Sequence, residues 1–186
     1  MAEEAGKAVR WLCERGLDGC GSLARLLQQV DGGRVRLEMP KTSDGDLQAV
    51  NHAICPLVLG AFVSDSAATL ETAPIVARGV AEPILLTPFV ALASQGVQGL
   101  VTLHCDGADG SVLAGEVCLA GEFGERGEEV RIELGGSVDH PSARVTRATP
   151  RQEDWRVLEA FAHRTYAPAT EQSRLSGAGA GVSDND

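Results

Sequence analysis

The sequence predicts an α+β fold in a single domain, with helices at the N- and C-terminal ends and a mostly antiparallel sheet in the middle. Three observations lead to this prediction. Apolar residues recur at helical spacing near both ends, and they alternate with polar residues in short runs between positions 99 and 135. No internal repeat or long linker divides the 186 residues. We therefore expect residues 1–176 to form the domain and the glycine-rich segment 177–186 to pack on it or to be partly disordered.

Two helices are expected at the N-terminus. Ala5, Val9 and Leu12 lie on one face of the first, which ends at Gly16. The second helix carries four apolar residues at positions i, i+3, i+4 and i+7 and stops at two glycines. These residues are Leu23, Leu26, Leu27 and Val30, followed by Gly32 and Gly33.

The next segment mixes strand and helix signals. Residues 34–39 alternate strictly between apolar and charged side chains, which predicts a half-buried strand. Ser43, with Asp46 three residues later, predicts the start of a helix that extends to Ile54. The apolar run 57–63 fits either a strand or a buried helix, because periodicity cannot separate the two.

The middle of the chain reads as one strand, one helix and then a group of strands. A strand is expected over 73–81 and a short helix over 87–96, with Thr87 as N-cap and Gly96 at its end. Turns that contain Gly and Asp then separate short alternating runs, as in an antiparallel sheet. The expected strands are 99–105, 112–121 and 128–135, with 142–148 as a further edge strand.

The clearest helix signal lies at 149–164. Thr149 suits the N-cap, Pro150 the first helical position, and Gln152 completes a capping box. A single domain allows a single core, so the apolar faces of all these elements should be buried together. The expected core residues are Leu23, Leu26, Leu27, Val101, Leu103, Val130, Ile132, Trp155, Leu158 and Phe161.

Composition narrows the classes of function. The net charge is −10 and Lys and Arg form no cluster, which argues against binding to nucleic acid or to an anionic membrane surface. The charged opening residues contain no secretory signal, and the two charge-free stretches, 47–64 and 83–105, carry polar residues and prolines. We therefore expect an acidic cytoplasmic protein with both stretches in its core.

The five cysteines are an odd number and form no C-x-x-C pair. A disulfide framework or a zinc knuckle would need closer, paired spacing. We expect free thiols, so that a reductant leaves the melting temperature unchanged.

The search for catalytic and cofactor motifs finds no P-loop, no H-E-x-x-H, no G-x-S-x-G and no EF-hand loop. The "GAGAG" at 177–181 lacks the spacing of a dinucleotide turn and does not follow a strand. His104 and Cys105 should point to opposite faces of a strand, and His52 with Cys55 is the one local Cys/His pair at helical spacing. Structural roles are the favoured interpretation for all of these. No metal is expected, and the cofactor and any catalytic residues stay unknown.

Two functions remain open. Residues 140–175 hold six Arg against four acids, and bidentate Arg suits a carboxylate or phosphate, so the first hypothesis is a site for a small anionic metabolite, with or without catalysis. The alternative is a non-catalytic assembly module, including a homo-oligomer, whose apolar N-terminal helices pack on a partner. The expected ligand-binding residues are Arg164, Tyr166, Thr170, Ser173, Arg174, Gly177, Gly179 and Gly181.

The closing stretch carries this first hypothesis. Alternating glycines let a backbone pass close to a ligand, and successive N–H groups can form an anion-binding nest. We expect residues 164–176 to be ordered against the domain and residues 177–183 to run beside the site. Deletion of 177–186 should then abolish ligand or partner binding and leave the fold intact.

The opening "AEEAGKAVRWLCERGLDG" and the closing "TYAPATEQSRLSGAGAGVSDND" resemble a bacterial family known as domain of unknown function 3726. The resemblance implies a bacterial origin and supplies no activity, cofactor or catalytic residue. Members of that family carry a further stretch before the matching residues, and the first helix here has no N-cap. Whether Met1 is the true start therefore stays open.

Overall fold

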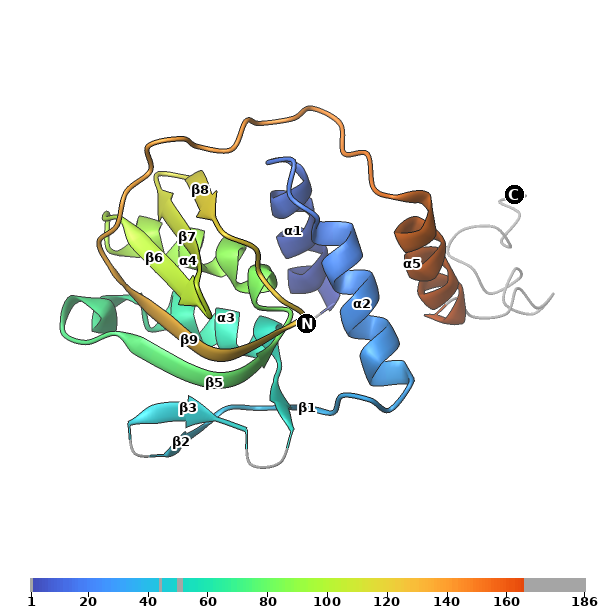
Figure 1. Cartoon of the computed structure of the whole chain (residues 1–186), viewed down its shortest axis with the longest axis horizontal. Helices are drawn as coiled ribbons and strands as arrows, with labels where there is room; N and C mark the ends of the chain where they lie inside the picture. The colour runs from blue at the N-terminus through green and yellow to red at the C-terminus, as the bar shows by residue number, and fades with distance from the viewer. Residues whose placement is uncertain (1, 44, 50–51, 166–186) are drawn as a thin grey trace, which may run out of the picture.

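The computed structural model describes residues 2–43, 45–49 and 52–165, and within them it confirms the α+β fold (Figure 1). Within these residues, five α-helices and two short 3-10 helices accompany one sheet. The helices are α1 (Ala2–Cys13), α2 (Gly19–Asp31), α3 (Pro56–Asp65), η1 (Ala67–Glu71), η2 (Pro83–Leu86), α4 (Thr87–Gly96) and α5 (Gln152–Thr165). None of these helices is long and apolar enough to cross a membrane.

The described strands form one mixed sheet that is mostly antiparallel. Its order is β1-β4-β5-β9-β6-β7-β8, with the β2–β3 hairpin joined to β5 through β3. The long strands β5, β9 and β6 lie at its centre and pair antiparallel, while β1–β4, β3–β5 and β4–β5 pair parallel. The strands are β1 (Leu37–Glu38), β2 (Lys41–Ser43), β3 (Asp46–Gln48), β4 (Ala53–Ile54), β5 (Ile75–Ala81), β6 (Val101–Cys105), β7 (Ala108–Leu113), β8 (Glu116–Ala120) and β9 (Arg126–Leu134).

The helices are arranged in layers on one side of the sheet. Figure 1 shows α3 and α4 behind the strands, with α1, α2 and α5 beside them in that order. The closest contacts agree: α4 packs on β6 and β7, α1 packs on α2, and α2 packs on α5. A long connection, residues 135–151, carries the chain from β9 over the molecule to α5 (Figure 1).

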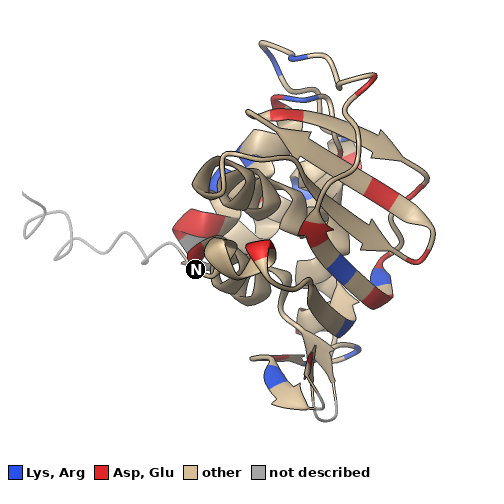
Figure 2. Cartoon of the chain, turned by 90° about the vertical axis from the view of Figure 1, so that its left-hand side faces the viewer, with Lys and Arg blue, Asp and Glu red and all other residues tan. Residues whose placement is uncertain are grey.

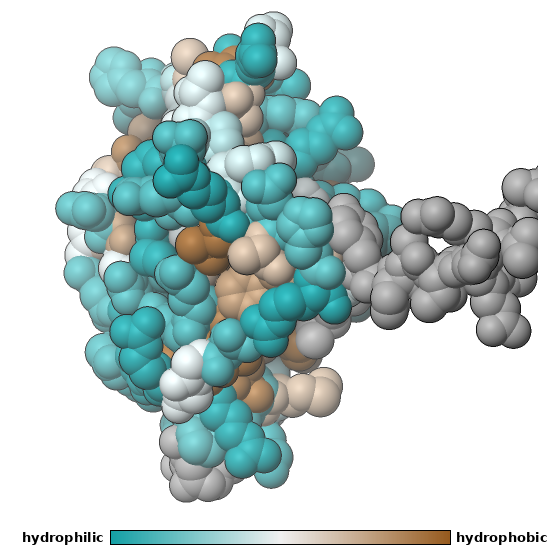
Figure 3. All heavy atoms as spheres, turned by 90° about the vertical axis from the view of Figure 1, so that its right-hand side faces the viewer, coloured by the Kyte–Doolittle hydropathy of each residue, from teal (hydrophilic) through white to brown (hydrophobic). Residues whose placement is uncertain are grey.

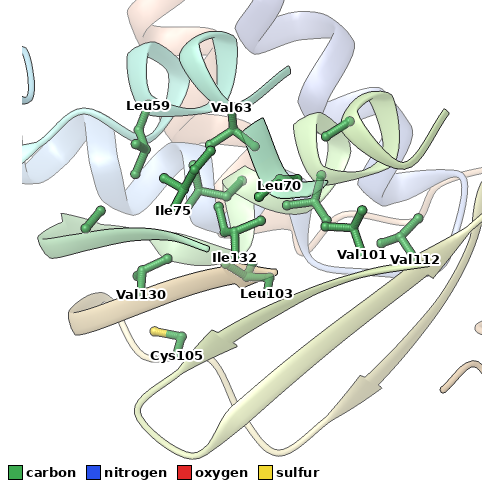
Figure 4. Packing of buried hydrophobic residues seen from close by; sticks show 14 of the residues in the cluster. Leu59, Val63, Leu70, Ile75, Val101, Leu103, Cys105, Val112, Val130 and Ile132 are labelled. Carbon is green, nitrogen blue, oxygen red and sulfur yellow. The ribbon is translucent and has the colours of Figure 1, made fainter. Parts of the chain in front are cut away.

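The buried apolar residues form two clusters instead of the single core expected. The larger lies between the sheet and the α3–α4 layer and includes Leu103 and Ile132, which are register partners on β6 and β9 (Figure 4). The smaller lies among α1, α2 and η2 and includes Leu12, Leu26 and Leu85. The smaller cluster also contains Ala53 of β4 and Ala81 of β5, so it packs α1 and α2 against the ends of these strands. Of the expected core, the residues confirmed as buried are Leu26, Val101, Leu103, Val130 and Ile132, whereas Leu23, Leu27, Leu158 and Phe161 are half-buried.

The expected phase of the last helix is wrong. Trp155 was expected in the core, yet 54% of its surface is exposed, and the residue that α5 buries is Asp154. Arg151 donates a 2.8 Å hydrogen bond from Nε to Oδ2 of Asp154, and its Nη2 lies 3.8 Å from Oδ2 of Asp18, so charged groups join this face of α5 to the start of α2. Val30 and Trp155 are both exposed apolar residues of these two helices. On the face of the molecule that lies to the right in Figure 1, hydrophobic residues occupy the middle of the surface and hydrophilic residues surround them (Figure 3).

The helix expected from Ser43 onward does not form. Its residues form instead the β2–β3 hairpin, in which Ser43 pairs with Asp46, followed by β4. Gly45 has a φ of +90°, a value that a tight turn needs and a helix excludes. Parallel pairing of β3 with β5, at Leu47 and Ala77, then fixes the segment in the sheet. Long-range pairing has overridden a local helix signal.

Other boundaries follow the sequence more closely. The ambiguous run 57–63 is helical within α3, and the run 112–121 divides into β7 and β8 at a turn. The expected edge strand 142–148 is absent: Ser142 N donates to Val117 O at 2.7 Å and Val145 N donates to Glu14 O at 2.8 Å, one contact to β8 and one to the end of α1. Thr87 is buried inside the helical turn instead of capping it, and α5 begins two residues after Pro150.

Charged residues of both signs are interspersed on the open side of the sheet (Figure 2). Arg78 of β5 pairs with Asp46 of β3 at 2.8 Å and with Glu129 of β9. Farther along the sheet, Arg131 Nε lies 2.7 Å from Glu133 Oε2. These ion pairs are exposed to solvent, so each contributes about 1 kcal/mol or less to stability. We assign them to a solvated sheet face.

Candidate binding cleft

Of the eight residues expected to bind a ligand, Arg164 is the one that the structure describes. Its Nη2 donates a 2.8 Å hydrogen bond to Asp31 Oδ1, and its guanidinium carbon lies 5.0 Å from the centre of the Phe161 ring. Arg164 thus serves to hold α5 against the end of α2. The other seven lie outside the described residues: Tyr166, Thr170, Ser173, Arg174, Gly177, Gly179 and Gly181.

Glu82, directly after β5, is one of four described non-glycine residues with a positive φ. Glu82 adopts φ 41° and ψ 61°, the left-handed region that costs an ordinary side chain about 1 kcal/mol or more, and it does so directly before Pro83. Its N–H donates a 2.7 Å hydrogen bond to Glu125 O, which ties the strained residue to the loop before β9. Strain of this kind persists only where the surrounding structure holds it, and it is frequent at binding sites.

The Glu82 side chain is 1% exposed, and Arg25 of α2 compensates its charge. Arg25 donates from Nε to Oε1 at 3.0 Å and from Nη2 to Oε2 at 3.1 Å, a bidentate arrangement. Burial raises the pKa of Glu82 above its usual value, and the hydrogen bonds from Arg25 oppose this shift without cancelling it. The same hydrogen bonds raise the pKa of Arg25, so the guanidinium is charged at all ordinary pH values.

Asp18 joins this pair to the last helix. As N-cap of α2 it accepts a 2.9 Å hydrogen bond from the Gly21 N–H at Oδ1. Its other oxygen, Oδ2, lies 3.5 Å from Arg25 Nη1 and 3.8 Å from Arg151 Nη2. The start of α2, the end of β5 and the start of α5 are therefore connected through one network of charged groups.

A surface cleft of about 500 Å³ opens beside this network, between α2 and the loop that joins β8 to β9. Its apolar lining comes from Ile84, Leu119 and Phe123. Asp18, Ser22 and Arg25 line one wall and the glycine-rich loop 121–125 lines another, with Arg151 at the edge. An apolar floor with a few converging polar groups is the usual arrangement of a small-molecule site.

The charge of the cleft is negative. Both of its arginines already face carboxylates of the protein, because Arg25 pairs with Glu82 and Arg151 pairs with Asp154 at 2.8 Å and with Glu153 at 3.2 Å. Glu125 accepts a 2.7 Å hydrogen bond from the neutral amide of Gln29. Glu122 makes no hydrogen bond or ion pair within the described parts of the chain. The carboxylates of the loop are thus left without a cation.

The other polar groups singled out in the sequence have structural partners. His104 Nδ1 lies 2.6 Å from Asp109 Oδ1 across the β6–β7 hairpin, and Cys105 is buried in the larger core cluster. His52 Nε2 lies 3.8 Å from Glu38 Oε1, while Cys55 is buried at the start of α3. No three His, Cys, Asp or Glu side chains among the described residues are grouped so that they could hold a metal ion.

Sequence reasoning missed this cleft. Three of its residues lie at the start of α2, where Asp18 was recognisable as an N-cap, but their meeting with Glu82 depends on tertiary packing. The one local signal for Glu82 was its place before Pro83, which favours an irregular backbone. The sequence also predicted that α5 buries Trp155, whereas it buries Asp154. With the wrong face assigned, the contact between the start of α5 and this site could not be predicted.

Fold and cleft define an α+β protein with one acidic surface cleft next to a buried Glu–Arg pair. Residues 1–77 match the family described as "Protein of unknown function (DUF3726)", and this match confirms the resemblance of the opening stretch to that family. The match covers α1, α2 and the chain as far as β5, and it includes Asp18 and Arg25. Glu82 and the closing stretch lie beyond it. No curated protein and no solved structure matches the chain.

Proposed function

We propose that the protein binds a small organic cation, an amine with an apolar substituent, in the cleft between α2 and the β8–β9 loop. The observation that carries this proposal is the charge of the cleft: its arginines are neutralised by the protein's own carboxylates, and Glu122 is left unpaired within the described residues. A net charge of −10 adds long-range attraction for a cation.

The apolar residues that line the cleft support the apolar substituent of the proposed ligand. Phe123 stands between Glu122 and Glu125 in sequence and lines the cleft with Leu119 and Ile84. An ammonium group at the loop carboxylates would lie near an aromatic ring, which attracts cations, and the apolar substituent would lie over the floor. In this proposal Glu82 is a positioning residue: it is too buried to meet a ligand and acts by fixing Arg25.

The test compares two probes of the same shape and opposite charge, 2-phenylethylamine and phenylacetate, by calorimetry or NMR titration. The amine should bind and the carboxylate should not. Glu122→Gln should weaken amine binding about fivefold, the effect of one exposed charge pair. Glu71→Gln, which changes an exposed acid on η1 that does not line the cleft, is the matched control and should bind normally.

Preferential binding of phenylacetate would overturn the proposal, as would amine binding that ignores Glu122→Gln. The first hypothesis, an anionic ligand bound by Arg164 and the residues after it, would then be favoured. Both versions of the proposal place the protein in the bacterial cytoplasm, without nucleic acid or membrane as a partner; the five free cysteines support a reducing compartment.

One observation favours the alternative, an assembly module. An apolar groove of about 410 Å³ runs between α1, α3 and α4, lined by Trp11, Phe89 and Leu92, and 52% of the Leu92 surface is exposed. Glu4 and Lys7 of α1 and Asp65 of α3 also line the groove, so in a two-fold dimer each copy would offer charges of both signs to the other. The occupant would be a second copy of the chain. Sedimentation should then show a dimer that Leu92→Asp dissociates; a wild-type monomer at high concentration would dismiss this alternative.

A further inference from the structure

Two of the five free cysteines lie against each other. The Sγ atoms of Cys13 and Cys20 are 3.7 Å apart, although the residues belong to different helices. Cys13 is the last residue of α1, and Cys20 lies in the first turn of α2. A thiol pair this close, on two rigid elements joined by a short turn, is the arrangement from which a disulfide forms with small movement.

Glycine makes this approach of the helices possible. A Cβ atom on Gly19 would lie 2.7 Å from the Val9 carbonyl oxygen and 3.0 Å from the Leu12 Cβ, so only glycine lets the start of α2 pack so tightly on α1. The turn between them is closed by a 3.0 Å hydrogen bond from Leu17 N to Leu12 O. The thiols are therefore held together by the packing of the backbone.

Two separate cavities reach the pair. One, of about 470 Å³, lies between the start of α2 and residues 145–151, and the other, of about 370 Å³, lies beside α1. Cys13, Cys20 and Val145 line both, so the connecting segment crosses directly above the thiols. A small oxidant can reach Cys13, which is partly exposed, although Cys20 itself is only 8% exposed.

We propose that Cys13 and Cys20 form an intramolecular disulfide when the protein meets hydrogen peroxide, and that this pair is an oxidative modification site. The thiolate of Cys13 attacks the peroxide O–O bond and becomes a sulfenic acid, releasing one water after proton transfer. Cys20 then attacks the Cys13 sulfur, the S–O bond breaks, and a second water leaves. In sum, two thiols and one peroxide give one disulfide and two waters.

The order of the two steps follows from the surroundings of Cys20. Burial raises its pKa to about 12, so it carries almost no thiolate at neutral pH and reacts second. The sulfur atoms must then approach by roughly 1.7 Å, from 3.7 Å to the 2.05 Å of a disulfide bond.

Trypsin cleavage after Arg10, Arg15 and Arg25 separates the two cysteines, which gives the proposal a direct readout. The full-length chain is reduced, freed of reductant, treated with hydrogen peroxide and digested without reduction. We expect mass spectrometry to find peptide 11–15 joined to peptide 16–25, and thiol titration to show the loss of two thiols per chain. Gel electrophoresis without reductant should show a monomer.

Three variants complete the test. Cys13→Ser and Cys20→Ser should each abolish the joined peptide, whereas Cys118→Ser, which removes the other partly exposed thiol, should leave it unchanged. Should Cys20→Ser fail to fold, the wild-type digest still decides, since it needs no variant. Recovery of both peptides unlinked after oxidation, or a crosslink that joins two chains, would refute the inference.

Discussion

At the scale of single residues, the structure uses buried charge sparingly and in pairs. Glu82 lies against Arg25, and Asp154 lies against Arg151, so each buried carboxylate meets a guanidinium. Glu82 and Arg25 are 57 positions apart in the chain, so no pattern of spacing announced their pairing, whereas Arg151 and Asp154 are only three positions apart. The apolar residues of β6 and β9 were predictable, because alternation in a strand assigns each side chain to a face.

Glu82 should make stability fall as pH rises. Its pKa is raised by burial above the ordinary 4.5, so the folded protein holds that proton more tightly than the unfolded chain. The stabilising effect of protonation is complete below 4.5 and is lost as pH rises through the raised pKa. Glu82→Gln cannot titrate. The free energy of unfolding of the wild type relative to this variant should therefore decrease as pH rises above about 4.5. Parallel curves, or an increase with pH, would show that Arg25 outweighs burial.

At the scale of elements, the presence of a helix or strand was easier to predict than the face that it buries. Regular segments such as α2, β5 and β9 were recognised from periodicity and caps, because their apolar faces are local properties. The failures share one cause. The β2–β3 hairpin and the face of α5 are decided by partners elsewhere in the chain, β5 in the first case and Asp18 of α2 in the second.

The contact between α3 and α4 should depend on a glycine. A Cβ atom on Gly60 would collide with the Phe89 ring, so Gly60→Ala should destabilise the protein by about 1–3 kcal/mol in chemical denaturation. Gly6→Ala in α1 is the control. Nothing lies within 4 Å of its added methyl group, and alanine should stabilise that helix by about 0.5–1 kcal/mol. Equal effects at both positions would mean that the helices do not pack as described.

The orientation of α5 gives a second pair of variants. Asp154→Ala removes the buried acceptor of Arg151 and should cost about 1–3 kcal/mol. Trp155→Ala, one position along, removes a largely exposed ring and should change the free energy of unfolding by about 0.5 kcal/mol or less. Urea denaturation of the two variants decides the matter: a larger loss for Trp155→Ala would restore the helix face expected from the sequence.

At the scale of the whole molecule, the fold class and the absence of recognisable catalytic motifs were within reach of the sequence, and the site was not. The cleft is assembled from α2, η2, the β8–β9 loop and the start of α5, four parts that span residues 18–151. Nothing short of the full topology brings them together. The predicted boundary at residue 176 lies outside the described residues and stays a prediction.

Deletion of residues 177–186 distinguishes the two candidate ligand sites, the cleft beside α2 and the C-terminal segment. The two buried apolar clusters of the described residues are formed between Leu12 and Ile132, so we expect circular dichroism and the melting temperature to be unchanged by the deletion. Amine binding should survive if the α2 cleft is the site. Loss of binding on deletion would instead favour the C-terminal site expected from Arg174 and the glycines that follow.

The connection between β9 and α5, which crosses above Cys13 and Cys20, also affects how two chains can exchange a helix when they refold together. Residues 135–151 contain no helix or strand, and at about 3.3 Å per residue these seventeen residues reach roughly 55 Å. Such a tether lets α5 leave its own α2 and occupy the same position on a neighbour, with the Arg151–Asp18 and Arg164–Asp31 pairs formed between chains. Refolding at high concentration should therefore produce a domain-swapped dimer that native chromatography separates from the monomer. A chain cut off after Leu134 should not form it.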